Sequence, residues 1–193
     1  FAVGNYPPLT ALVFGTPLRW VVMFSPLVIL LVSSFAMKNP SPTGAGMVYW
    51  SIVTLMGIGL GSIFLMYTDT SIAKTFLITA ASFGFLSLWG YTTKKDLSGM
   101  GSFLIMGLFG LILASIVNIF MKSGPLDLAI SAIGVLIFAG LIAFDTQRLK
   151  HTYYDIGGDA RGTAVATNFG ALSLYLNFIN LFMFLLRFFG SRE

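Results

Sequence analysis

The sequence predicts an all-α membrane protein, a polytopic bundle of six transmembrane helices in a single domain over residues 1–193. Two observations support this fold class. Hydrophobic residues make up 56% of the chain and charged residues only 9%, whereas a soluble domain carries roughly 25% charged residues. The few charges also separate long apolar runs, most of which reach the roughly 20 residues that a helix needs to cross a bilayer.

The apolar runs define the order of the expected helices. Short links separate most of the runs, so neighbouring helices should pack antiparallel, and the one longer loop, rich in Gly and Asp, is expected over residues 151–167. Barrel strands would instead appear as segments of about ten residues with alternating polarity. The six helices are expected at residues 18–37, 47–67, 72–92, 100–121, 126–149 and 168–189.

The basic residues indicate which face of the bundle is cytoplasmic, because cytoplasmic loops carry an excess of Lys and Arg. The chain begins at Phe1 without a secretory signal pattern, and we expect a further helix before it in the whole protein. The residues expected on the cytoplasmic side are Lys38, Lys94, Lys95, Arg148, Lys150 and Arg161. Those expected on the opposite side are Arg19, Lys74, Lys122, Arg187 and Arg192.

Several functional classes find no support in the residues present. The chain has no cysteine and one histidine, His151, so disulfides and Cys- or His-based metal clusters are not expected. No HExxH or GxSxG pattern occurs, so we expect neither an enzyme nor a bound cofactor. The basic residues are scattered singly, which argues against nucleic acid. The glycines of 57–62 resemble a phosphate loop but lie in an apolar run, where small residues let helices approach closely. Asn118 is expected to bond to a neighbouring helix.

One acidic residue lies inside a predicted helix. Asp145 is about five residues, roughly 7–8 Å, from the end of its helix near Lys150. Insertion of an Asp at a helix centre costs about 2.5–3.5 kcal/mol, so we expect Asp145 to have a polar partner or a water pathway. Arg148 lies three residues further on the same face and offers the alternative of a simple local ion pair.

The last predicted helix carries a polar face. Its members are spaced by 4, 3, 4 and 3 residues, which places them on one side of a helix. They are Ser173, Asn177, Asn180, Phe184 and Arg187. A polar face must avoid lipid, so it either bonds to other helices for assembly, at about 0.6 kcal/mol per contact, or lines a pathway. Asn177 lies roughly 12 Å from the same membrane face as Asp145, so the two side chains could meet.

Three segments resemble the transmembrane Bax inhibitor motif family, in its bacterial branch of the YetJ and YccA type. They are Ala-Phe-Asp-Thr-Gln at 143–147, Leu-Ser-Leu-Tyr-Leu-Asn-Phe-Ile-Asn-Leu-Phe at 172–182 and Leu-Leu-Arg-Phe-Phe-Gly at 185–190. The resemblance implies seven helices, of which six surround a central C-terminal helix. The helix at 168–189 would be the central one, and this chain looks like a member lacking most of the first helix.

The resemblance also implies a function, a pH-sensitive calcium leak channel of the bacterial inner (plasma) membrane, with Ca²⁺ as the transported ion. In similar proteins two aspartates on the last two helices share a proton near the cytoplasmic side. Asp145 matches the first, and Asn177 stands where the second would be. Asp145 and Asn177 are therefore the expected gate and pH sensor, and Asp145 a transient Ca²⁺ ligand. Lys38 or Arg148 is the expected latch, and Ser173 and Asn180 the expected pathway lining.

The change from Asp to Asn at 177 has a physical consequence. Two close carboxylates repel each other and share a proton, and an Asp–Asn pair lacks that repulsion. Asn can donate to an ionised Asp145 or accept from a protonated one. Ca²⁺ prefers several charged oxygen ligands, so one carboxylate and one amide form a weaker site, which suits passage.

Two other functional classes remain open. Some similar bacterial proteins regulate a membrane-bound AAA protease, so a non-conducting regulator of such a protease, or of stress or cell-death signalling, is the alternative. A proton-coupled transporter that uses Asp145 is a third class. The expected partners are the lipid bilayer, Ca²⁺, protons and, in the alternative, a membrane protease, and the chain is expected to be a monomer.

Overall fold

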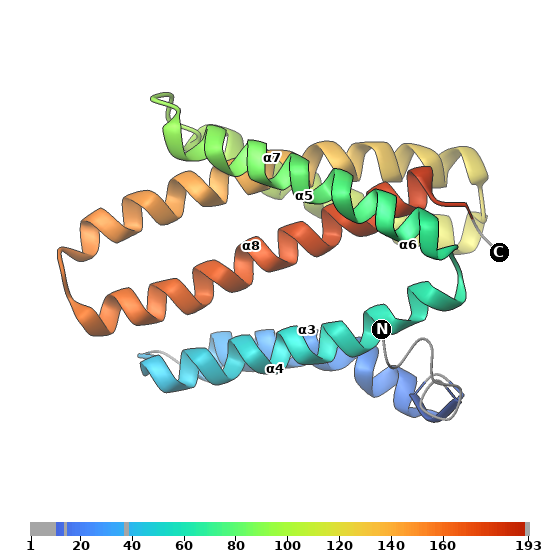
Figure 1. The fold of residues 1–193 in the computed structure, drawn as a ribbon, viewed down its shortest axis with the longest axis horizontal. Helices are drawn as coiled ribbons and strands as arrows, with labels where there is room; N and C mark the ends of the chain where they lie inside the picture. Colours follow the sequence, from blue (N-terminus) through green and yellow to red (C-terminus); the bar gives the residue numbers. More distant parts are fainter. Residues whose placement is uncertain (1–10, 14, 37–38, 192–193) are drawn as a thin grey trace. The chain divides into compact units, whose positions relative to one another are not determined.

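The computed structural model describes residues 11–13, 15–36 and 39–191, and no β-strand occurs among them. Figure 1 shows the helices in chain order. They are α3 (Leu18–Ala36), α4 (Pro42–Leu60), the 3-10 helix η1 (Gly61–Leu65), α5 (Asp69–Thr92), α6 (Ser98–Met121), α7 (Gly124–Ile156) and α8 (Ala160–Phe189). The predicted all-α class is confirmed.

Among the residues that the structure describes, five helical segments are long and apolar enough to cross a membrane. They are Pro42–Leu65, which combines α4 and η1, and the helices α5, α6, α7 and α8. The first predicted segment forms α3, a helix of 19 residues that contains Pro26. Each of the six predicted segments therefore corresponds to a helix among the described residues, the second of them ending at Leu65, and the long apolar helices make the protein a polytopic membrane bundle.

The prediction of a loop over residues 151–167 is wrong, because both flanking helices continue into this segment. Helix α7 runs on to Ile156, and α8 already begins at Ala160. Gly157 and Gly158 form the turn with positive φ angles of 62° and 92°, which glycine adopts without strain. The Asp159 carboxylate then accepts hydrogen bonds from the first backbone N–H groups of α8, as a helix N-cap does. Hydropathy marks only the membrane-embedded part of a helix, so it missed both polar extensions.

The described residues form two compact units. The first comprises 11–72 with the gaps given above, 156–172 and 191, and the second comprises 73–155 and 173–190. In the first unit, α3 packs against α4. Ser41 begins α4 because its hydroxyl accepts the Gly44 N–H at 3.0 Å and Pro42 follows at the first helical position. The 57–62 segment is helical, and a Cβ at Gly59 would lie 3.7 Å from Val22 of α3.

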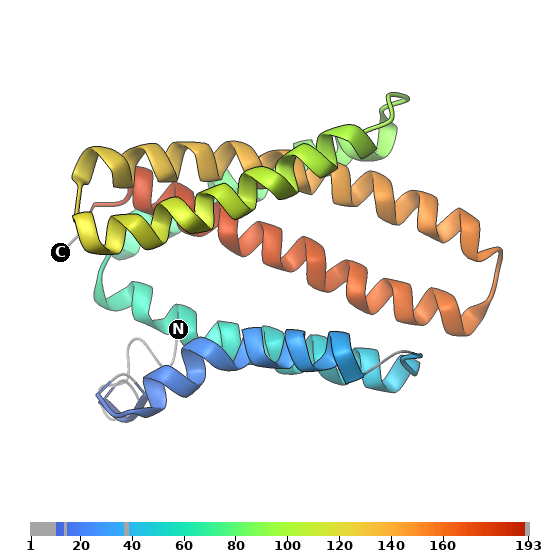
Figure 2. The ribbon, with the colours of Figure 1, turned by 180° about the vertical axis from the view of Figure 1, so that it is seen from behind.

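The second unit is organised around α7. Figure 2 shows α6 lying beside α7, to which a short turn joins it. A Cβ on Gly101 of α6 would collide with Phe144 of α7, and a Cβ on Gly90 of α5 would collide with the backbone of Ala143. Glycine therefore lets α5 and α6 approach α7 closely.

Helix α8 is the other interior helix of the second unit. Phe184 stacks on Phe138 of α7 with a centroid distance of 5.7 Å, and Phe178 packs edge-on against Phe76 and Phe83 of α5. Of the apolar stretches of α7 and α8, 44% is buried, against 11–17% in α4, α5 and α6. Helix α8, the C-terminal helix, is therefore an interior helix as expected, and α7 is a second one.

Candidate functional site

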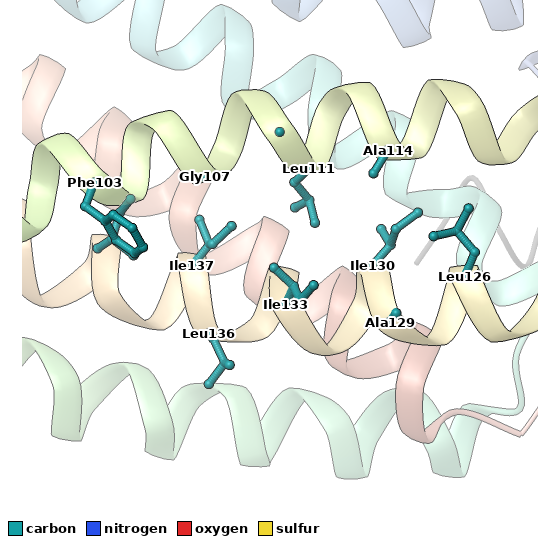
Figure 3. Close-up of a pocket in the computed structure, with 12 residues that line it drawn as sticks. Phe103, Gly107, Leu111, Ala114, Leu126, Ala129, Ile130, Ile133, Leu136 and Ile137 are labelled. Carbon is teal, nitrogen blue, oxygen red and sulfur yellow. The ribbon is translucent and has the colours of Figure 1, made fainter.

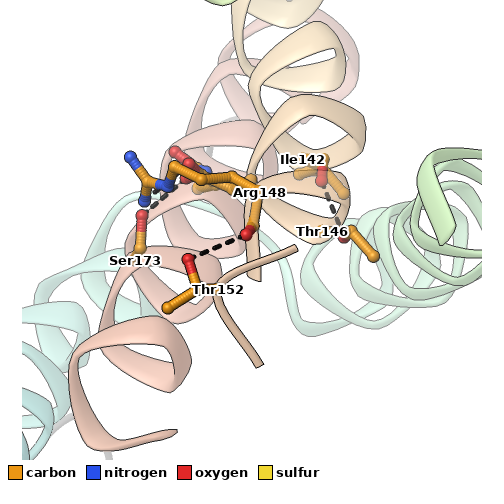
Figure 4. Close-up of polar contacts among 7 residues, drawn as sticks. Ile142, Thr146, Arg148, Thr152 and Ser173 are labelled. Carbon is orange, nitrogen blue, oxygen red and sulfur yellow. Dashed lines mark hydrogen bonds and ion pairs between the residues drawn. The ribbon is translucent and has the colours of Figure 1, made fainter. Parts of the chain in front are cut away.

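Asp145 lies on the buried side of α7, where its carboxylate has three partners. Its side chain is only 7% exposed. Oδ2 accepts hydrogen bonds from the Ser173 hydroxyl at 2.5 Å and from Asn177 Nδ2 at 2.7 Å. Oδ1 pairs with the Arg148 guanidinium at 2.8 Å. Figure 4 shows the Arg148 side chain extending towards Ser173 of α8. Both carboxylate oxygens are therefore occupied by donors from two helices.

Helix α8 presents its two donors from successive turns of one face. Ser173 and Asn177 are four residues apart, which brings their side chains into line on a helix. Asn177 is buried, with 7% of its surface exposed. The predicted meeting of Asp145 with the polar face of the last helix is confirmed, and both residues belong to the second compact unit.

Arg148 supplies the charge that balances Asp145. Its side chain is 49% exposed, and its guanidinium also lies 5.6 Å from the ring centre of Phe144. A buried carboxylate is costly without a counter-charge, and a half-exposed arginine supplies one while it remains partly hydrated. The sequence left a local ion pair and a contact with α8 as alternatives, and the structure contains both on one carboxylate.

The rest of the polar face of α8 does not converge on Asp145. Asn180 Nδ2 donates to the Leu176 carbonyl of its own helix at 2.8 Å. Phe184 packs against α7, and Arg187 pairs with Asp127 at 3.3 Å near the opposite end of α7. Lys38, the other expected latch, lies outside the described residues.

Gln147 is a buried polar residue for which the sequence analysis assigned no partner. Its side-chain amide donates to the Lys95 carbonyl at 2.8 Å, and its Oε1 accepts the Leu97 N–H at 2.9 Å. Lys150 adds a hydrogen bond to the Tyr91 carbonyl at 2.7 Å. Together these contacts attach the turn between α5 and α6 to α7 beside Asp145. The sequence did contain a signal for this contact: Gln147 is a neutral amide directly after Asp-Thr in an apolar helix, where its side chain needs a hydrogen-bond partner.

The Ser87 hydroxyl group lies buried in the second unit. Among the described residues, the Ser87 hydroxyl is a buried side-chain oxygen with no hydrogen-bond partner. Leaving such a group unpaired typically costs about 1–3 kcal/mol.

In the α5–α6 turn, hydrogen bonds from the Ser98 side chain and backbone hold the pKa of the exposed Asp96 below its usual range.

Asn118 differs from its expected role. Its side-chain oxygen accepts the Ser123 N–H at 3.0 Å, so it closes the turn after α6 instead of bonding to a neighbouring helix.

The described part of the chain contains no group of three or more His, Asp or Glu side chains that could hold a metal ion. Asp145 is thus a single carboxylate held by two neutral donors and one arginine.

The comparisons with known proteins identify the family of this chain. The family model described as "Inhibitor of apoptosis-promoting Bax1" matches residues 2–193. The chain belongs to the Bax inhibitor family. It is therefore a Bax inhibitor family membrane protein, as the segments around Asp145 and Asn177 predicted.

Relatives of this Bax inhibitor family chain occur in several bacteria. A protein of Caulobacter vibrioides is 66% identical over 178 residues, which cover 92% of this chain and 71% of that protein. The inner membrane protein YbhL of Escherichia coli is 46% identical over 175 residues, covering 89% of this chain and 74% of YbhL. A membrane protein of Streptococcus pyogenes is 40% identical over 168 residues, 86% of this chain and 72% of that protein. With these relatives and five apolar helices, the chain is a multi-pass protein of the bacterial inner membrane.

Proposed function

We propose that this Bax inhibitor family protein is a pH-sensitive leak pathway for Ca²⁺, gated at Asp145 and Asn177. The observation that carries the proposal is a buried carboxylate held by donors from α8 and by a half-exposed arginine. An ionisable group inside a membrane helix typically marks an ion or proton pathway. The lipid bilayer surrounds the pathway, and Ca²⁺ and protons are its ligands.

In this proposal, the contacts of Asp145 correspond to the closed gate. Ser173 and Asn177 occupy Oδ2, and Arg148 occupies Oδ1. A cation can approach only after Arg148 moves away, and the 49% exposure of that side chain leaves it room to turn towards water. Carboxylate, hydroxyl and amide oxygens are hard ligands of the type that Ca²⁺ prefers. With one charged ligand they bind weakly, which suits passage.

Protonation offers a means of opening. A neutral Asp145 no longer attracts the guanidinium of Arg148. The hydroxyl of Ser173 and the amide of Asn177 can each act as donor or acceptor, so the contact between α7 and α8 survives in either protonation state. Arg148 is the charged group in contact with Asp145 on α7, and α8 contributes neutral side chains. Acidification is therefore expected to release Arg148 and raise the leak.

Calcium flux into liposomes that contain the purified protein and a trapped calcium indicator tests this proposal. Asp145→Ala should abolish the pH dependence, because it removes the proposed pH sensor. Asn177→Asp should steepen it, because two adjacent carboxylates share a proton and titrate as a coupled pair. Ser131→Ala is the matched control, since Ser131 is equally buried on α7 but donates only to the Asp127 carbonyl of its own helix.

The same assay can refute the gate. Identical, pH-independent flux in the wild type, Asp145→Ala and Asn177→Asp would exclude a gate at this site. Absence of flux in all three, with intact folding, would instead favour the non-conducting regulator.

A further inference from the structure

A groove runs along the seam between α6 and α7 (Figure 3). Its volume is about 400 Å³, within the roughly 300–1,000 Å³ of typical ligand sites. Phe103 and Leu136 at one end are each 72% exposed, so the groove is open at the surface of the two helices. All twelve lining residues are apolar or glycine: Phe103, Leu104, Gly107, Gly110, Leu111, Ala114, Leu126, Ala129, Ile130, Ile133, Leu136 and Ile137.

Small residues on α6 create the hollow, and its length corresponds to one membrane leaflet. A Cβ at Gly110 would meet nothing within 4 Å, and a Cβ at Gly107 would lie 3.2 Å from Ile137. On α7 the lining extends from Leu126 to Ile137, roughly 16 Å at 1.5 Å per residue. Half of a hydrocarbon core of roughly 30 Å is about 15 Å, so the groove has the length that one acyl chain occupies.

The turn at the Leu126 end of the groove carries an uncompensated positive charge. Lys122 is exposed and makes no ion pair with any described residue, whereas the nearby Asp127 is already paired with Arg187. Lys122 has a left-handed backbone with φ of 49°, which glycine or asparagine adopts more readily. Asn118 accepts the N–H of Lys122 at 2.8 Å on its backbone oxygen, and this bond holds the turn in place.

We propose that this groove binds one acyl chain of an anionic phospholipid, with the lipid phosphate at Lys122. The apolar lining fits the chain, and the groove begins at Leu126, four residues after the lysine along the chain, so both parts of one lipid can bind together. A lysine at the membrane surface attracts anionic headgroups. The site is separate from Asp145, because no Asp, Asn or Arg lines it.

Photo-crosslinking with a diazirine-tagged phosphatidylglycerol tests the assignment. The full chain is placed in nanodiscs of phosphatidylcholine with a small share of the probe, and the labelled peptides are mapped by mass spectrometry. Gly110→Phe is designed to fill the groove, since an added Cβ at Gly110 meets nothing within 4 Å. Gly84→Phe is the matched control, because Gly84 is also an exposed helix glycine with nothing within 4 Å of an added Cβ but lies on α5. Lys122→Gln tests the headgroup contact, with Lys74→Gln as its control.

The expected result is labelling concentrated on the groove residues, competed by untagged phosphatidylglycerol. Gly110→Phe should reduce this labelling to the level of the remaining lipid-facing surface, and Gly84→Phe should leave it unchanged. Lys122→Gln should lower the preference for phosphatidylglycerol over phosphatidylcholine by about fivefold, and Lys74→Gln should not. Labelling spread evenly over α5, α6 and α7, or unaffected by Gly110→Phe, would overturn the proposal.

Discussion

Replacing Gln147 with Met should loosen the attachment of the α5–α6 turn to α7. The native side chain is buried and bonds to the Lys95 carbonyl at 2.8 Å and the Leu97 N–H at 2.9 Å. Met has nearly the same length and fills the same space with an unbranched chain. The substitution therefore removes both hydrogen bonds while it preserves most of the packing.

The expected magnitude follows from the burial of the two partners. Leu97 is 5% exposed, so its N–H loses its acceptor in a position that water reaches poorly. An unsatisfied buried donor costs about 1–3 kcal/mol. Lys95 is exposed, so its carbonyl can turn to water at little cost. We expect the turn to open about thirtyfold more often, which corresponds to about 2 kcal/mol.

Hydrogen exchange at the Leu97 amide, followed by mass spectrometry or NMR, measures this opening directly. Gln147→Glu should give an intermediate loss of protection, because a carboxylate accepts the Leu97 N–H but cannot donate to the Lys95 carbonyl. Thr152→Ala is the control, since its hydroxyl bonds only to the Arg148 carbonyl one turn back. If exchange at Leu97 is the same in Gln147→Met as in the wild type, Gln147 does not hold the turn.

Two further substitutions test the packing and the charge of the second unit. Gly134→Ala should lower the thermal midpoint in a detergent melt by an amount that corresponds to about 1–3 kcal/mol, because its Cβ would lie 2.7 Å from the Phe184 ring, whereas Gly110→Ala enters open space and should be neutral. Asp96→Asn should leave the pH profile of calcium flux unchanged over the range of about pH 5 to 8. The pKa of Asp96 is already below its ordinary value of 3.8 because of the Ser98 hydrogen bonds. Its stabilising effect is fully present above that ordinary value and is lost only as the pH falls through the lower folded pKa. A profile that moves in Asp96→Asn would contradict this.

Asp145 illustrates how far the site was predictable. Its place inside an apolar helix was enough to predict a polar partner, because a charge within the membrane must be compensated. The choice among Arg148, Ser173 and Asn177 was not predictable from spacing. Arg148 lies on the same helix, three residues away, whereas the α8 partners are 28 and 32 residues away along the chain. The helical turn brings Arg148 near, but only the packing of α7 against α8 brings the other two.

The sequence by itself determined the class of the protein and the course of its helices, since a bilayer requires long apolar segments whose backbone groups bond internally. That requirement acts locally and can be read along the chain. The tertiary structure alone decided the partners of Gln147, the extension of α7 and α8 across the predicted loop, and the groove beside Gly110. These depend on the register and close approach of separate helices, and hydropathy contains no information about either.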